Sequence, residues 1–357
     1  MSADYPRKGR GAQSNQPSRF LSDVVVAMPE DDDEHRNQSV IPIKTTCRPD
    51  TARSALTYNQ SPDIPFDRSI NPYRGCEHGC IYCFARPSHA YLDLSPGLDF
   101  ETRLFYKTGL VDTLKTELQA RSYRCDTVAL SPNTDCYQPI ERRFGITRQI
   151  LEVLYQCRHP VSIITKSSLV LRDTDLLATM AQRNLITVVV SVTTLDSGLS
   201  ARLEPRAAAP HRRLDIIEKL SIAGVPTGVL FAPVIPFIND NEIEDVLAAC
   251  KQRGATSAGY VLLRLPLEVR NLWLEWLESY FPDRASRVMK TLRDAHGGKD
   301  YDSTFGKRMT GAGVYADLIE QRFNLARQRN RMSQRSMKLD THQFNPALLS
   351  GQLQLFD

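Results

Sequence analysis

Residues 127–263 constrain the fold more than any other part of the chain. Short apolar runs rich in β-branched residues alternate there with segments of helical periodicity, a pattern typical of strand–helix units around a parallel sheet. A similar run precedes them, so the expected strands are residues 68–73, 127–131, 161–165, 186–192, 228–234 and 258–263. Six units are fewer than the eight of a closed barrel, which leaves a partial barrel or a doubly wound sheet.

The composition at the two ends differs from that of this core. Residues 1–45 are polar and include an acidic run, so we expect a disordered N-terminal tail. Residues 60–281 form the expected barrel core, and residues 282–357 form the expected C-terminal helical extension. The extension carries a basic stretch that either faces solvent or contacts phosphates. Its basic residues are Arg322, Arg327, Arg329, Arg331, Arg335 and Lys338.

Apolar content and charge indicate a soluble protein. No run approaches the roughly 18 consecutive apolar residues that a spanning helix needs, and the N-terminus lacks the apolar segment of a signal peptide. We therefore expect a cytoplasmic protein without membrane contact. In a reducing compartment its eight cysteines are not expected to form disulfides, and a close group of them indicates metal or redox chemistry. The formal net charge of +4 does not by itself imply nucleic acid.

Three of the cysteines lie in the sequence NPYRGCEHGCIYCFARP, which includes the end of the first expected strand. Cys76, Cys80 and Cys83 have the spacing CxxxCxxC, and thiolates on one tight loop can each bind one iron of a cubane cluster. A cubane usually takes four cysteines, so three leave one iron open to chelate the amino and carboxylate groups of S-adenosylmethionine. The alternative is structural zinc with His78 or His89 as the fourth ligand.

The motif CxxxCxxC with an aromatic residue before its last cysteine, here Tyr82, resembles the defining motif of the radical S-adenosylmethionine superfamily. The resemblance covers about residues 60–280 and implies an α/β fold, a partial (βα)6 TIM-like barrel. It implies an enzyme that holds a [4Fe-4S] cluster, packs the adenine of S-adenosylmethionine near Tyr82, and generates a 5'-deoxyadenosyl radical. It also implies an electron donor, either a reductase or a flavodoxin or ferredoxin.

Two longer stretches are similar to the spore photoproduct lyase-related group of that superfamily. They are SPDIPFDRSINPYRGCEHGCIYCFARPSHAYLDLSPGLDFE and SPNTDCYQPIE. The group, often labelled DNA repair photolyases, implies a lyase or modification reaction that begins with hydrogen abstraction from DNA or RNA. A radical reaction on a protein or a small molecule is one alternative. A non-catalytic nucleic-acid-binding protein stabilised by an Fe–S or zinc site is another.

The resemblance also places cofactor-binding residues after the second and third strands. Superfamily members commonly bind the amino group of S-adenosylmethionine there through Gly-Gly-Glu, whereas this chain has Asn133, Thr134 and Asp135 in that place. By position, these three side chains are expected to accept hydrogen bonds from the ammonium group. After the third strand, Lys166 resembles a lysine of spore photoproduct lyase and is expected to bind the cofactor's carboxylate or ribose.

Further candidates come from the fourth strand and from the end of the second. Ser191 lies at the end of the fourth expected strand and is a cofactor-binding candidate. Beyond it, Glu204-Pro205-Arg206 resembles acidic-x-Arg sequences whose guanidinium binds the cofactor's carboxylate, so Arg206 is expected to do the same. Spore photoproduct lyase returns a hydrogen atom to its product radical from a cysteine near the end of strand two. Cys136 lies close to that position and is the candidate hydrogen donor.

Overall fold

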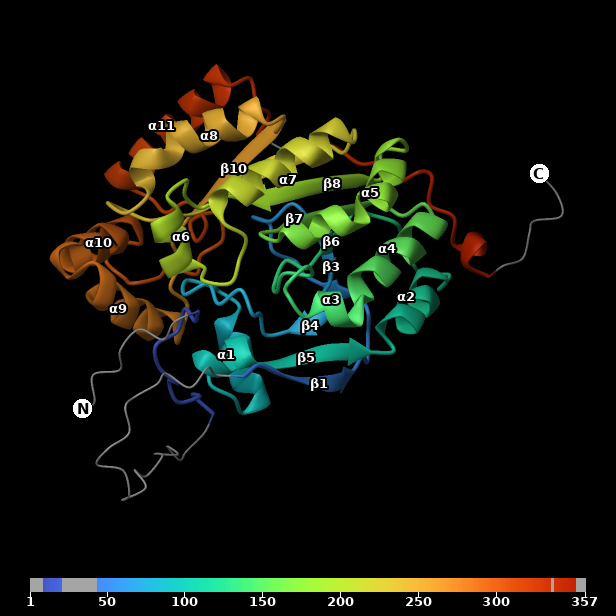
Figure 1. The fold of residues 1–357 in the computed structure, drawn as a ribbon, viewed down its shortest axis with the longest axis horizontal. Coiled ribbons are helices and arrows are strands. Elements are labelled where there is room, and N and C mark those ends of the chain that lie inside the picture. The colour runs from blue at the N-terminus through green and yellow to red at the C-terminus, as the bar shows by residue number, and fades with distance from the viewer. Residues whose placement is uncertain (1–8, 21–43, 335–336, 351–357) are drawn as a thin grey trace.

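A seven-stranded sheet forms the centre of the molecule. In the computed structural model, which describes residues 9–20, 44–334 and 337–350, six of its strands run parallel. β2, Thr57–Tyr58, pairs antiparallel with β3 at one edge of the sheet. Among the described residues, β10 at the other edge does not pair with β2, so the sheet is not closed and the predicted partial barrel is confirmed (Figure 1). In order, the parallel strands are β3 Arg68–Ile70, β6 Val128–Leu130, β7 Val161–Thr165, β8 Ile186–Ser191, β9 Thr227–Val234 and β10 Ser257–Leu262.

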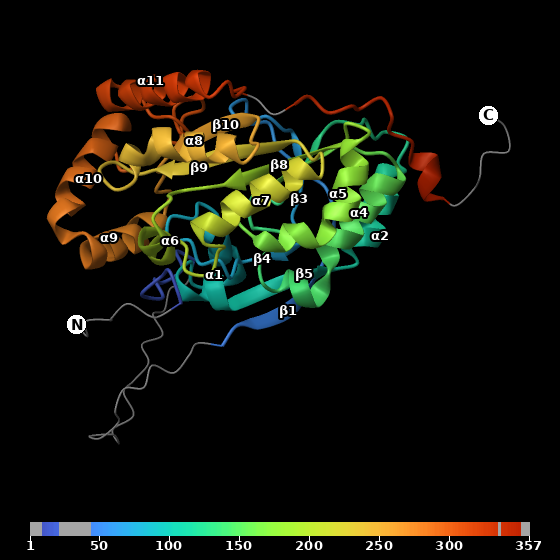
Figure 2. The same ribbon diagram turned by 45° about the horizontal axis from the view of Figure 1, so that its top comes forward.

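Helices cover the outer face of this sheet (Figure 2). Ile243, Val246 and Leu247 form the inward stripe of α8 and are all 0% exposed, as the helical periodicity predicts. The strands are apolar on both faces because helices cover one face and the barrel interior the other. The flanking helices are α4 Ile146–Gln156, α5 Thr174–Ala181, α7 Pro210–Ile222 and α8 Ile243–Gln252, with the shorter α3 Glu141–Phe144, α6 Ser197–Leu203, η2 Ser168–Asp173 and η3 Asp240–Glu242.

A second sheet lies beside the first and was not predicted (Figure 1). Its order is β1-β5-β4, with β1 parallel and β4 antiparallel to β5. The expected strand at residues 68–73 is therefore split, because β3 belongs to the main sheet and β4 to the small one. The elements of this region are β1 Thr46–Thr51, β4 Tyr73–Arg74, η1 Arg86–Leu92, α1 Leu98–Thr102, β5 Arg103–Thr108 and α2 Leu110–Leu118.

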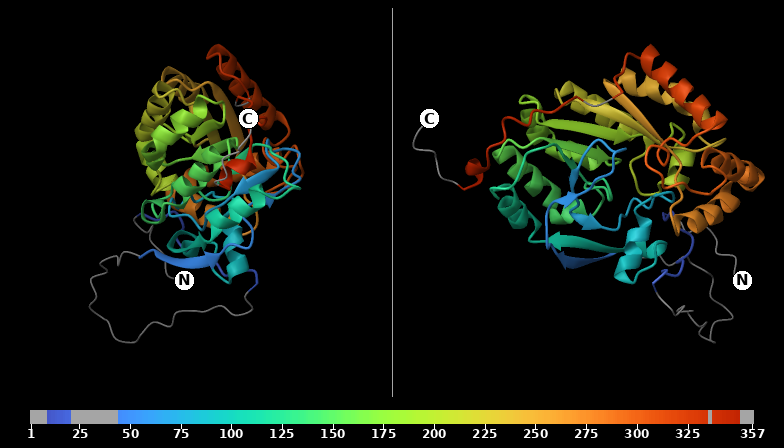
Figure 3. Two further views of the ribbon diagram at one scale, coloured as in Figure 1. Left: turned by 90° about the vertical axis from the view of Figure 1, so that its right-hand side faces the viewer. Right: turned by 180° about the vertical axis from the view of Figure 1, so that it is seen from behind.

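The C-terminal part is mainly helical (Figure 3). α9, Val269–Tyr280, follows the last strand and buries Trp273 and Trp276, whose rings lie 5.0 Å apart. It is followed by α10 Pro282–Ala295, α11 Val314–Arg329 and η4 Pro346–Leu349, and α11 packs on α8. Among the described residues, no helix combines the length and apolar character needed to cross a membrane.

The predicted basic stretch lies mainly on α11 and the turn after it. Arg322 pairs with Glu244 of α8 at 2.7 Å, and Arg327 donates to the carbonyl oxygen of Met332 at 3.1 Å. Arg335 lies outside the described residues. At least two of the basic side chains therefore have partners within the protein, and phosphate binding by this stretch stays a prediction.

Residues 9–20 do not form the disordered tail that we predicted. Ala12 is 0% exposed, and the backbone N–H groups of Gly11 and Ala12 donate to the carboxylate of Glu101 on α1 at 3.0 and 2.8 Å. The hydrophobic pattern of the sequence does not predict this segment, because hydrogen bonds from main-chain N–H groups to a buried carboxylate fix it, and not the packing of apolar side chains. Residues 1–8 and 21–43 of the predicted tail lie outside the described residues.

The ends of β8 and β9 are held together by Asn239. Its Oδ1 accepts from the backbone N–H of Ile235 at 2.7 Å, and its Nδ2 donates to the carbonyl oxygens of Thr193 and Pro233 at 2.8 and 2.9 Å. Asn239→Ala leaves three buried backbone groups unpaired, so we expect the free energy of unfolding to fall by about 2–4 kcal/mol. Urea denaturation of the apoprotein measures it.

The neighbouring Asn241 is exposed and provides the matched control. Asn241→Ala should change the free energy of unfolding by less than about 0.5 kcal/mol. If Asn239→Ala behaved like Asn241→Ala, the three hydrogen bonds would not hold the strand ends.

Candidate functional site

Cys76, Cys80 and Cys83 lie on one loop between β4 and η1, which we call the cysteine loop (residues 75–83). All three thiols are free. Gly75 and Gly79 have φ angles of 75° and 67°, in the left-handed region that favours glycine. A Cβ on Gly75 would lie only 2.6 Å from the Leu104 side chain, so the loop backbone is packed closely against β5.

Buried groups from other elements bind the backbone of the cysteine loop. Gln138, after β6, accepts from the N–H of Glu77 at 2.9 Å and donates to the carbonyl of Gly75 at 3.0 Å. The N–H of Ile81 donates to the carbonyl of Leu203 in α6 at 3.0 Å. Gln138 was not predicted as a site residue, because a glutamine in a turn carries no local signal of its partner.

The donor set fits an iron–sulfur cluster. Burial raises the pKa of Cys80 to about 12, and burial together with nearby charges, including those of Asp135, Cys80 and Cys83, raises the pKa of Cys76. Iron binds the deprotonated thiolate, so cluster assembly would displace these protons. Three soft sulfur donors on one loop match the ligand preference of iron–sulfur clusters.

The two histidines considered for zinc have other partners. Nδ1 of His78 lies 3.5 Å from a carboxylate oxygen of Asp135, and Nε2 of His89 lies 2.9 Å from the carbonyl oxygen of Arg103. Within the described ranges, no three His, Cys, Asp or Glu side chains are grouped closely enough to hold a single metal ion.

A buried polar network lies beside the cysteine loop. The hydroxyl of Tyr82 donates to Glu204, which also pairs with Arg213 and accepts from the hydroxyl of Thr193 at 2.8 Å. Burial alone would raise the pKa of Glu204, but Arg213 and Lys166 outweigh it and the pKa lies below its usual value. Arg213 was missed from the sequence because it lies within the amphipathic helix α7 with no motif around it.

Lys166 and Ser191 lie beside this network, at the ends of β7 and β8. The ammonium group of Lys166 is 5.9 Å from the ring centroid of Tyr82. Burial lowers the pKa of Lys166, but the charges of Cys80 and Glu204 raise it by more, so the charged form is favoured. The buried hydroxyl of Ser191 has no hydrogen-bond partner among the described residues. An ammonium group and an unpaired hydroxyl are suitable partners for a ligand's carboxylate and ribose.

The predicted Arg206 follows α6 and contacts a different part of the cysteine loop. Its guanidinium, in a side chain that is 38% exposed, pairs with Glu77 at 3.1 Å, and its backbone N–H donates to the carbonyl of His78. Arg213, seven positions further along the chain, forms the buried pair with Glu204. Binding of a carboxylate by Arg206 stays a prediction.

The segment after β6 is only partly directed at the site. Asn133 is exposed, and the hydroxyl of Thr134 donates to the carbonyl of Tyr73 at 3.0 Å. Asp135 accepts from the backbone N–H of Lys166 at 2.7 Å and from the hydroxyl of Thr165 at 2.8 Å. Its carboxylate thereby connects the ends of β6 and β7, and ammonium binding by these residues stays a prediction.

Cys136 lies in the hydrophobic core. Its side chain is 0% exposed, and burial raises its pKa. Its backbone carbonyl accepts from the hydroxyl of Thr147 at 2.7 Å. The thiol therefore has no exposed surface at the strand ends, and its role as hydrogen donor stays a prediction.

Aromatic and arginine side chains gather where the main sheet is open. Phe84, which directly follows Cys83, is 43% exposed, and the guanidinium of Arg264 after β10 lies 4.6 Å from its ring centroid. Arg308 lies 4.8 Å from the ring of the exposed Phe305 and pairs with Asp63 at 2.6 Å. Since Asp63 lies in the connection between β2 and β3, this ion pair bridges towards the other edge of the sheet.

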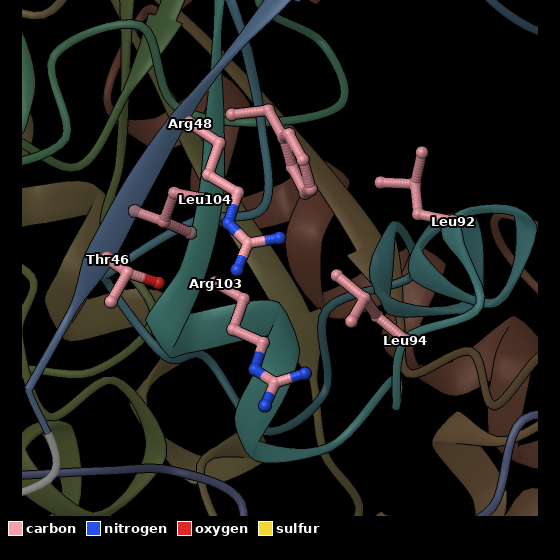
Figure 4. A pocket seen from close by; sticks show the side chains of 7 residues that line it. Thr46, Arg48, Leu92, Leu94, Arg103 and Leu104 are labelled. Carbon is pink, nitrogen blue, oxygen red and sulfur yellow. The ribbon is translucent and has the colours of Figure 1, made fainter.

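A hollow on the small sheet lies apart from these residues (Figure 4). It has a volume of about 260 Å³, and two arginine side chains, Arg48 and Arg103, are part of its lining. None of the predicted site residues lines it. The complete lining is Thr46, Arg48, Leu92, Leu94, Arg103, Leu104 and Phe105.

Comparison with curated proteins finds similar chains of uncharacterized function. A protein of Mycobacterium tuberculosis is 38% identical over 232 residues, which cover 64% of this chain and 68% of the relative. A protein of Methanocaldococcus jannaschii is 30% identical over 174 residues, 48% of this chain and 62% of the relative. A protein of Acidianus two-tailed virus is 26% identical over 264 residues, 71% of this chain and 85% of the relative.

Among solved structures, spore photoproduct lyase complexed with dinucleoside spore photoproduct has a similar fold. The TM-score is 0.55 at 12% sequence identity, and the match covers 79% of each chain. A variant of the same enzyme was solved with bound AdoMet and the dinucleoside spore photoproduct, with the same TM-score. At this identity the likeness concerns the fold alone.

A family model settles the wider classification. The model of the radical SAM superfamily matches residues 70–250, which include the cysteine loop and the ends of β6, β7, β8 and β9. The expectation of an enzyme is confirmed by this match, and the non-catalytic alternative is not supported. The chain belongs to the radical SAM superfamily and is an enzyme whose cofactors are S-adenosylmethionine and a [4Fe-4S] cluster.

Proposed function

We propose that Cys76, Cys80 and Cys83 hold the cluster and that the enzyme abstracts hydrogen from a nucleic-acid substrate in a repair or modification reaction. The observation that carries the first part is the cysteine loop itself, with three free thiols on a tightly held backbone beside a buried network. When bound, the cluster supplies the electron that cleaves S-adenosylmethionine to a 5'-deoxyadenosyl radical. That electron comes from a reductase, flavodoxin or ferredoxin.

The side chains around the loop have the chemistry to orient S-adenosylmethionine. Lys166 supplies a cation for its carboxylate, and the unpaired hydroxyl of Ser191 supplies a donor and an acceptor for its ribose. Tyr82 offers an aromatic ring for the adenine. Glu204 and Arg213 hold the Tyr82 hydroxyl through a fully buried ion pair, so they position that ring.

The arginine and aromatic side chains at the opening support a nucleic-acid substrate. Unstacked bases bind to aromatic rings and guanidinium planes, and phosphates bind to arginine. Phe84 and Arg264 present such a surface next to Cys83. The fold is shared with spore photoproduct lyase, which was solved with a dinucleoside photoproduct, and this is consistent with the proposal. A protein or small-molecule substrate is the alternative.

Cys80→Ala should abolish the cofactor chemistry because it removes one of three iron ligands. After anaerobic reconstitution we expect about four iron and four sulfide ions per parent chain, and 5'-deoxyadenosine after reduction with S-adenosylmethionine. Elemental analysis and chromatography measure these quantities. The control Cys125→Ala, at a half-buried cysteine distant in sequence from the loop, should behave like the parent. Equal product from Cys80→Ala would contradict the ligand assignment.

Lys166→Met should weaken binding of S-adenosylmethionine about 10- to 100-fold, because a charge-assisted hydrogen bond contributes about 1.5–3 kcal/mol. Anaerobic calorimetry on the reconstituted enzyme measures the dissociation constant. The control Lys219→Met removes an exposed lysine of α7 and should leave the dissociation constant unchanged. An unchanged dissociation constant for Lys166→Met would exclude a contact between Lys166 and the carboxylate of S-adenosylmethionine.

Arg264→Gln should weaken binding of a fluorescein-labelled single-stranded oligonucleotide about three- to tenfold, because one stacking partner is lost. Fluorescence anisotropy at low salt measures this binding. Formation of 5'-deoxyadenosine without substrate should not change. The control is Arg143→Gln in α3, which also removes an arginine that lies over an aromatic ring. The guanidinium of Arg143 is 5.0 Å from the ring centroid of Phe144. If both variants bound the oligonucleotide like the parent, the opening would not be the nucleic-acid surface.

A further inference from the structure

Arg86, three residues after Cys83, is completely buried although it is charged. Its Nε donates to the carbonyl of Cys80 at 2.9 Å, and one Nη donates to the carbonyl of Gly79 at 3.2 Å. The other Nη donates to the carbonyls of Pro96 and Gly97 at 3.1 and 2.9 Å. A planar guanidinium with five N–H donors suits such a set of carbonyls. Arg86 therefore holds the backbone of the cysteine loop at one of its three cysteines.

Glu101 of α1 is the counter-ion of Arg86. Their side chains lie 2.5 Å apart, and both are 0% exposed. The same carboxylate accepts the backbone N–H groups of Gly11 and Ala12, so a single buried group joins the N-terminal segment to Arg86. A buried carboxylate needs such donors, because an unpaired buried charge is very costly.

The segment also touches the cysteine loop directly. A Cβ added to Gly11 would lie 1.8 Å from the carbonyl oxygen of Gly79, and one added to Gly79 would lie 2.7 Å from a carboxylate oxygen of Glu101. Two glycines therefore face each other where no side chain fits. The φ angle of Gly11 is outside the left-handed region. A glycine is therefore needed at this position because of the close contact with Gly79, and not because of the backbone conformation.

The rest of the segment is fastened to the helix that follows the last strand of the barrel. Ser14 donates to Glu275 of α9 at 2.7 Å, and Arg19 binds both carboxylate oxygens of Glu268 at 2.6 and 2.8 Å. Ser279 of α9 donates to Gln13 at 3.0 Å. The segment thus runs from the cysteine loop to α9, and both of its ends have defined partners.

We propose that residues 10–12 form a clasp over the cysteine loop, and that Gly11, Glu101 and Arg86 are positioning residues that keep the loop closed around its cluster. This inference rests on the proposed function in one respect, namely that the loop holds the cluster. The clasp covers the backbone at Gly79 and keeps the Cys80 carbonyl bound to Arg86. Opening it exposes the loop and lets iron leave.

Gly11→Val tests the clasp, because its side chain collides with Gly79 without changing the loop or any thiol. Pro17→Val places the same side chain at an exposed position of the same segment and is the matched control. Hydrogen exchange of the apoprotein at residues 76–81 should become about tenfold faster in Gly11→Val, with the strands β7 to β9 unchanged. Iron release from the reconstituted protein to a bathophenanthroline chelator should accelerate by a similar factor.

A second variant guards against a general loss of folding. Glu101→Gln keeps the size of the side chain and removes the charge that pairs with Arg86, so it should show the same local acceleration with unchanged strands. Exchange at residues 76–81 equal to that of Pro17→Val in both variants, or acceleration that extends equally to β7, β8 and β9, would overturn the clasp. A parent that binds no iron would overturn the proposed function instead, since the exchange measurement needs no cluster.

Discussion

The proposed binding of the cluster depends on the backbone conformation of the cysteine loop, residues 75–83. Three thiols on so short a loop reach one cofactor only if the loop keeps one shape, and ordering a backbone costs about 1–2 kcal/mol per residue. Gln138, after β6, and Arg86, at the start of η1, offset this cost by binding carbonyl and N–H groups of the loop. Because both side chains are fully buried, water does not compete for these hydrogen bonds.

The same hydrogen bonds place the remaining side chains of the site. Tyr82 belongs to the cysteine loop, so the loop's position sets where its ring meets the buried pair of Glu204 and Arg213. Lys166 reaches this ring from the end of β7, while Phe84 continues the loop towards the opening of the sheet. The proposed cluster ligands, the ring proposed for the adenine and the exposed ring of Phe84 thus follow one another within residues 76–84, and Lys166 and Arg264 meet them from the carboxyl ends of β7 and β10.

Local patterns predicted the parts of the fold that local chemistry determines. The runs of β-branched residues located all six parallel strands, with β7 matched at both ends, and the cysteine spacing located the loop. The small sheet was missed because β1 has the sequence TCRPDT, whose mostly exposed residues show no apolar alternation. Arg213 and residues 9–20 were missed because a carboxylate on another element, Glu204 or Glu101, determines their roles. Such partners are visible only once the chain is folded.

The most direct test of the central claim is electron–nuclear double resonance of the reduced, reconstituted enzyme with S-adenosylmethionine labelled with nitrogen-15 in its amino group. Three cysteine ligands leave one iron open, so the account predicts a strong coupling between the cluster and the labelled nitrogen. A cluster signal that S-adenosylmethionine leaves unchanged would mean that no iron is open to the cofactor, and it would contradict the account.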